Sequence, residues 1–163
     1  MAVNITVKDI KYEDFVNYKK PSMFIAFPSC TFKCERECGQ KMCQNSSLMQ
    51  SPNKTIGIKT ILNRYINNPI TSAIVMGGLE PFDSEKDLHM LISYLRTVTQ
   101  DDIVVYTGYT EEEVKSKEIY NMLIKFPNII IKFGRYIPNQ QKHYDEILGV
   151  ELASNNQYGK RIS

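Results

Sequence analysis

The sequence predicts an α/β fold with parallel strands. Short apolar runs alternate along the chain with amphipathic segments of helical spacing, and this order is typical of parallel strands joined by right-handed crossovers. With 163 residues, 42% of them hydrophobic and 23% charged, the chain suits one compact domain. We therefore expect residues 1–163 to form a single domain, in which the role of the N-terminal extension, residues 1–20, is not indicated by any pattern.

The first predicted strand covers residues 23–27, which are apolar and lie between Pro21 and Pro28. It opens into a segment that contains all the cysteines. Beyond that segment, apolar side chains recur at helical spacing over residues 58–66, and the Asn-Asn-Pro sequence at residues 67–69 ends the pattern. These features predict a buried strand and, after the cysteine segment, an amphipathic helix.

The second unit begins with a predicted strand at residues 72–76, which leads into Gly77 and Gly78. A helix follows, with Ser84 as its predicted N-cap and Asp87 three residues on. The apolar face of this helix is marked by Leu88, Leu91, Ile92 and Leu95.

The third unit follows the same order. Residues 103–106 form a predicted strand, and Thr110 with Glu113 forms a predicted capping box that opens a helix ending at about Phe126. Residues 128–133 form the fourth predicted strand.

Four segments follow the predicted strands at their carboxyl ends. Parallel α/β sheets bind their ligands along this edge, so we expect the four segments to share one rim. They are the cysteine segment, residues 77–80, residues 106–108 and residues 133–134.

The four cysteines fall within fourteen residues, and the chain has no others. Thiolates this close in sequence can converge on a single soft metal centre. The cysteines are Cys30, Cys34, Cys38 and Cys43.

Charge and hydropathy exclude several classes of protein. The formal net charge of +2 is nearly neutral, so the sequence predicts no nucleic-acid partner and no anionic membrane surface. No stretch approaches the roughly 20 apolar residues of a membrane span, and the N-terminus lacks the features of a signal peptide. We expect a cytoplasmic protein, in which clustered thiols favour a metal or redox site over a disulfide.

Together, these motifs resemble those of radical S-adenosylmethionine (SAM) enzymes, which combine a cysteine loop after the first strand with a Gly-Gly-Glu-Pro-like turn after the next βα unit. Here that turn is residues 77–81, Gly-Gly-Leu-Glu-Pro. Residues 105–113 and the tail at residues 152–162 are similar to the activating components of anaerobic ribonucleotide reductases, which activate glycyl-radical enzymes. The resemblance implies an incomplete (partial) βα barrel of radical SAM type, since a complete barrel takes about 250 residues.

One departure from the family concerns the cysteine spacing. The family places three residues between the first two cysteines, as Cys30 and Cys34 have, and two between the second and the third. Cys38 comes one residue late and follows the charged Glu37, whereas the family has an apolar or aromatic residue there.

Cys43 fits the family context better, because it follows the apolar Met42. The resemblance therefore implies that Cys30, Cys34 and Cys43 are the metal ligands and that residues 35–41 contain a small insertion. On this interpretation Cys38 is not a ligand; the alternative is the spacing that uses it.

Three thiolates leave one iron of a [4Fe–4S] cluster open to a small molecule, which in the family is SAM. The reduced cluster gives SAM an electron, and the carbon–sulfur bond breaks to a 5′-deoxyadenosyl radical. Glu80 would accept a hydrogen bond from the ammonium group of SAM, and the two glycines would allow close approach of the backbone. The implied SAM-binding residues are Gly77, Gly78, Glu80, Tyr106, Thr107 and Gly108.

The first hypothesis is thus a radical SAM oxidoreductase that generates a glycyl radical on an anaerobic ribonucleotide reductase large subunit or a related glycyl-radical enzyme. Its electron donor would be a protein such as flavodoxin or ferredoxin. A second hypothesis is a radical SAM enzyme that acts on a small molecule, as the deazapurine-forming members do. A third is a non-catalytic zinc-binding module, in which all four cysteines hold the metal.

Overall fold

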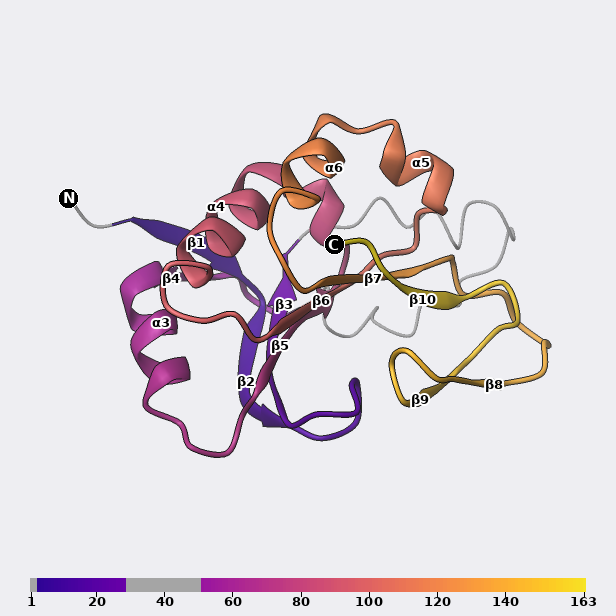
Figure 1. Cartoon of the computed structure of the whole chain (residues 1–163), viewed down its shortest axis with the longest axis horizontal. Helices are drawn as coiled ribbons and strands as arrows, with labels where there is room; N and C mark the ends of the chain where they lie inside the picture. Colours follow the sequence, from indigo (N-terminus) through magenta and orange to yellow (C-terminus); the bar gives the residue numbers. More distant parts are fainter. Residues whose placement is uncertain (1–2, 29–50) are drawn as a thin grey trace.

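The computed structural model of the chain describes residues 3–28 and 51–163 (Figure 1). Within these ranges the largest element is a six-stranded sheet with the strand order β10-β7-β6-β5-β3-β2. The four central strands are parallel, and the two edge strands pair with them antiparallel. In chain order these strands are β2 (Asp9–Asp14), β3 (Ser22–Phe27), β5 (Ala73–Gly78), β6 (Asp102–Tyr106), β7 (Ile129–Phe133) and β10 (Tyr158–Arg161).

The central strands confirm the four predicted strands to within two residues at each end. The predicted helices at residues 58–66 and after Ser84 are also present, as α3 (Ile58–Ile66) and α4 (Glu85–Leu95). A short 3-10 helix, η1 (Pro81–Asp83), precedes α4. Ser84 is the N-cap residue of α4, as predicted, but its side chain makes no capping hydrogen bond.

The third helix differs from the prediction. The capping box of Thr110 and Glu113 is confirmed, but the helix it opens, α5 (Glu111–Lys115), is short, and a separate helix, α6 (Glu118–Leu123), follows. The apolar pattern explains the break, since Val114 and the next buried residue, Ile119, are five positions apart. That spacing does not return to the same face of one helix, so the chain turns before α6 buries Ile119.

The N-terminal residues belong to the sheet structure. The strand β1 (Asn4–Val7) pairs antiparallel with β4 (Lys54–Gly57), and β2 forms one edge of the main sheet. Near the other end of the chain, β8 (His143–Asp145) and β9 (Val150–Leu152) form a two-stranded hairpin.

The helices pack on one face of the main sheet, and the β8–β9 hairpin lies on the other side (Figure 1). On the helical face, α3, α4, α5 and α6 bury apolar side chains against Ile74, Met76 and Val105. On the opposite face, Val75 and Val104 pack with Leu148 and Leu152. Alternation along each strand thus gives the sheet two apolar faces, as a sheet covered on both sides requires.

The fold is therefore mixed α/β with a sheet at its core. The incomplete barrel and the single-domain organisation stay predictions. In the part of the chain that the structure describes, no helix combines the length and the apolar character needed to cross a membrane.

Candidate functional site

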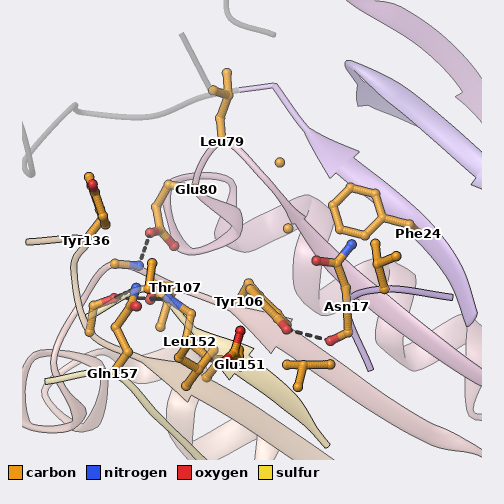
Figure 2. A pocket seen from close by; sticks show the side chains of 18 residues that line it. Asn17, Phe24, Leu79, Glu80, Tyr106, Thr107, Tyr136, Glu151, Leu152 and Gln157 are labelled. Atoms are coloured by element: carbon orange, nitrogen blue, oxygen red, sulfur yellow. Dashed lines mark hydrogen bonds between the residues drawn. The ribbon is translucent and has the colours of Figure 1, made fainter. Parts of the chain in front are cut away.

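A cavity of about 320 Å³ lies at the carboxyl ends of β5, β6 and β7, on the face of the sheet that the helices leave open (Figure 2). Its size falls within the range of small-molecule sites. The expectation of a common rim is confirmed for the segments after these three strands. The six predicted SAM-binding residues all line the cavity: Gly77, Gly78, Glu80, Tyr106, Thr107 and Gly108.

Protein neighbours lie close to both glycines at the end of β5. Gly78 has a φ of +80°, and a Cβ added there would lie 2.7 Å from the Cα atom of Ala26 on β3. A Cβ on Gly77 would lie 3.2 Å from the ring of Phe24. The fold alone therefore explains glycine at position 78, whether or not a ligand approaches the backbone there.

Glu80 is a buried carboxylate at the cavity, with 6% of its surface exposed. Its Oε1 atom accepts the backbone N–H of Phe82 at 3.1 Å, which caps η1, and its Oε2 atom accepts the backbone N–H of Gly108 at 2.8 Å. Burial raises the pKa of Glu80 to about 7, although these hydrogen bonds and one from Thr107 act to lower it. Near neutral pH the Glu80 side chain therefore exchanges between its protonated and its ionised form.

Tyr106 reaches across the open face of the sheet. Its hydroxyl donates a hydrogen bond to the backbone oxygen of Asn17, in the turn after β2, and Figure 2 shows the two residues pointing toward one another. Asn17 is itself held by Asp14, whose carboxylate accepts its backbone and side-chain N–H groups. Burial, with the charges of Asp14 and Asp145, raises the pKa of the Tyr106 hydroxyl, so it is a stable donor.

The turn after β6 is fixed from several directions. Thr107 is buried and accepts the backbone N–H of Tyr109 on its Oγ1 atom at 3.0 Å. The hydroxyl of Tyr109 donates to Asp83 in η1 at 2.6 Å, and its backbone oxygen accepts the N–H of Gly134 at 2.9 Å. The turns after β5, β6 and β7 therefore form one connected rim.

The C-terminal tail closes this rim. Ser154 and Gln157 are buried, and the Gln157 side chain joins Gly134 to Ser154, donating to the oxygen of the first and accepting the N–H of the second. Asn155 and Asn156 are exposed, although the Asn156 amide contacts the chain just after β7.

Sequence reasoning missed several residues of the cavity wall, above all Lys132 and Asn17. Lys132 lies on β7 and is 7% exposed. A signal for it exists, since it is the one charged residue in the otherwise apolar strand Ile129–Phe133. No comparable signal marks Asn17, which reaches the cavity only because the turn after β2 folds over the sheet.

Cys30, Cys34, Cys38 and Cys43, and with them the predicted insertion at residues 35–41, lie outside the described residues. The end of β3, after which the cysteines follow in the sequence, lies beside the cavity, because the backbone oxygen of Phe27 accepts the N–H of Leu79, a cavity residue, at 3.3 Å. Residues 3–28 and 51–163 contain no group of three or more His, Cys, Asp or Glu side chains able to hold a metal. The cysteines are therefore the thiolate donors that the sequence offers for a metal centre.

Comparison with known proteins identifies the class of this centre. A family model described as a 4Fe-4S single cluster domain matches residues 21–158, which include the cysteines and the four parallel strands of the main sheet, β3, β5, β6 and β7. No curated protein matches the chain in sequence. The chain belongs to the family of 4Fe-4S single cluster domains and is an iron–sulfur protein.

Proposed function

We propose that this iron–sulfur protein is a radical SAM enzyme that activates a glycyl-radical enzyme. The observation that carries the proposal is the cavity around Glu80, which lies at the carboxyl edge of the sheet next to the end of β3. An iron–sulfur cluster held by residues that follow β3 would lie at this edge, so that cluster and cavity would serve one reaction. The proposal includes the incomplete barrel, whose open side suits a macromolecular substrate.

The residues of the cavity fit SAM. A carboxylate offers about four lone-pair positions, and Glu80 uses three of them for hydrogen bonds from the backbone N–H groups of Phe82 and Gly108 and from the side chain of Thr107. Capacity remains for the amino group of SAM. The volume of about 320 Å³ suits a small ligand, and the mixed apolar and polar lining is typical of such sites.

Each part of the cavity has a proposed task. Glu80 would bind the amino group of SAM, and Tyr106, Thr107 and Gly108 would line its sugar and adenine side. The link between Tyr106 and Asn17 would cover the ligand and exclude water from it. When bound, the cluster and SAM supply the electron transfer and the radical chemistry, which are properties of the cofactors.

The partner assignment is supported by the resemblance of residues 105–113 and of the tail to activases. We propose the large subunit of an anaerobic ribonucleotide reductase, or a related glycyl-radical enzyme, as the substrate and flavodoxin or ferredoxin as the electron donor. The family match favours iron–sulfur chemistry over the zinc-binding hypothesis.

The test is an anaerobic reconstitution with iron and sulfide, followed by reduction and addition of SAM. We expect about four irons per chain, release of 5′-deoxyadenosine, and a glycyl-radical signal in electron paramagnetic resonance when the reductase large subunit is present. A colourless protein that carries zinc would contradict the proposal. SAM cleavage coupled fully to a purine-like small molecule, with no protein partner, would replace the activase by the second hypothesis.

A matched pair of variants tests the site itself. Glu80→Gln keeps the shape but removes the charge, and a charge-assisted hydrogen bond is worth roughly one to two decades of affinity. SAM should therefore bind this variant about tenfold to a hundredfold more weakly, with the iron content unchanged. Glu112→Gln, at an exposed position on α5, is the control and should bind SAM as the native protein does. Unchanged binding by Glu80→Gln would remove Glu80 from the site.

A further inference from the structure

The N-terminal strands connect the two sides of the cysteine segment. In the chain, β3 precedes the cysteines and β4 follows them. The strand β1 pairs with β4, with Val7 opposite Lys54. The strand β2 pairs with β3, with Asp9 opposite Ala26. The N-terminal chain therefore crosses from the strand after the cysteines to the strand before them, and Lys8 is the residue at the crossing.

Lys8 is buried at this crossing, with 6% of its surface exposed, and it contacts both sides. Its backbone N–H donates to the oxygen of Ala26, near the end of β3, at 2.7 Å. Its Nζ atom donates to the backbone oxygen of Ser51, which lies between the cysteines and β4. Lysine is almost never fully buried unless it is paired, and here the main chain that returns from the cysteines accepts its hydrogen bond.

The position of Lys8 is fixed by the fold. Ile5 and Val7, on β1 just before it, are buried in the core on the helical face of the sheet. A second lysine contact spans the same crossing, since the Nζ atom of Lys54 lies 3.2 Å from the carboxylate of Asp9. Both of these side chains are about 60% exposed, and such surface ion pairs contribute little to stability. The buried contact of Lys8 is therefore the one expected to hold the crossing together.

We propose that Lys8 is a positioning residue for the iron–sulfur centre. Its ammonium group holds the chain that returns from the cysteines beside the end of β3, from which the chain leaves toward them. Cysteine ligands retain a cluster only while they converge on it, and holding the two ends of their segment together lowers the entropic cost of that convergence. This gives residues 1–20 a role that no sequence pattern indicates. The inference depends on the chain being an iron–sulfur protein and not on SAM or a protein partner.

The test measures how firmly the protein retains iron. The native protein, Lys8→Met, Lys8→Arg and Lys54→Met are reconstituted anaerobically with iron and sulfide and then mixed with an excess of the ferrous-iron chelator bathophenanthroline. The rate of iron release is followed by absorbance. Lys8→Arg keeps the charge and the N–H donors, and Lys54→Met is the matched control, because it removes the exposed lysine of the same crossing. Thermal unfolding of each protein before reconstitution reports on the fold alone.

Lys8→Met should release iron about tenfold to a hundredfold faster than the native protein, because it loses a hydrogen bond from a charged donor. Lys8→Arg and Lys54→Met should release iron at close to the native rate. The iron-free Lys8→Met protein should unfold near the native temperature, since methionine adapts to a buried site and needs no polar partner.

Three results would overturn the inference. Release of iron from Lys8→Met at the native rate would show that the contact with Ser51 does not hold the centre. Equally fast release from Lys8→Arg or Lys54→Met would show that the buried hydrogen bond is not the cause. A large fall in the melting temperature of iron-free Lys8→Met would make Lys8 a residue of the fold in general and not of the iron–sulfur centre.

Discussion

The Oε2 atom of Glu80 lies 2.8 Å from the backbone nitrogen of Gly108, so this carboxylate joins the turn after β5 to the turn after β6. Glu80 also caps η1 through Phe82. A buried carboxylate with two backbone donors organises the cavity before any ligand enters it.

Glu80 should make stability depend on pH near neutrality. Its pKa is raised from 4.5 to about 7 by burial, so between these values the folded protein binds a proton that the unfolded chain has released. Stability contributed by Glu80 should therefore be complete below about pH 4.5 and fall as pH rises toward 7, by about 3 kcal/mol in total. Urea unfolding at several pH values, for the native protein and Glu80→Gln, measures this.

The variant should lack this fall, because its amide does not titrate. Glu80→Gln should also be less stable than the native protein at low pH. Its NH₂ group cannot accept a hydrogen bond, so the backbone N–H of either Phe82 or Gly108 loses its acceptor. Parallel curves of unfolding free energy against pH for the two proteins would show that Glu80 has an ordinary pKa.

Gly78→Ala should destabilise the fold strongly. Alanine at a φ of +80° is strained, and its Cβ would lie 2.7 Å from the backbone of β3, so we expect a loss of about 2 kcal/mol or more. Gly57→Ala is the matched control, because Gly57 has a φ of −70° and its nearest neighbour would be 3.4 Å from the new Cβ. Thermal unfolding of both proteins decides the matter; similar melting temperatures would contradict the geometry at Gly78.

Tyr106→Phe should release the turn after β2. The variant loses the hydrogen bond to the backbone oxygen of Asn17, which costs about 1 kcal/mol. Tyr144→Phe, at a side chain that is 63% exposed, should have no measurable effect. Hydrogen exchange should also speed up in residues 15–20 of Tyr106→Phe alone. Unchanged exchange there would mean that other contacts hold this turn.

The parallel strands and their common edge could be predicted because apolar runs and turn residues report local structure. Gly78, Glu80 and Gly108 each follow a strand directly, so the order of the elements was enough to bring them together. The contact between Tyr106 and Asn17 joins residues 89 positions apart and depends on how the turn after β2 folds over the sheet. No local pattern contains that information.

The single helix predicted after Thr110 shows a different limit. The capping box correctly marks its start, but the five-residue step from the buried Val114 to the buried Ile119 divides the segment into two helices. Lys132 shows a third limit. Its charge is visible in an apolar strand, but no local pattern predicts that Lys132 and Glu80 both contact the peptide group between Thr107 and Gly108.

The central claim is that three thiolates hold a [4Fe–4S] cluster with one iron open to SAM, and the iron content of the four single Cys→Ala proteins tests it most directly. After anaerobic reconstitution, Cys30→Ala, Cys34→Ala and Cys43→Ala should lose the cluster or keep a smaller form, because a second iron then lacks its thiolate. Cys38→Ala should keep about four irons. Loss at Cys38 with retention at Cys43 would contradict the ligand assignment, and loss at all four positions would indicate a closed four-thiolate site with no iron open to SAM.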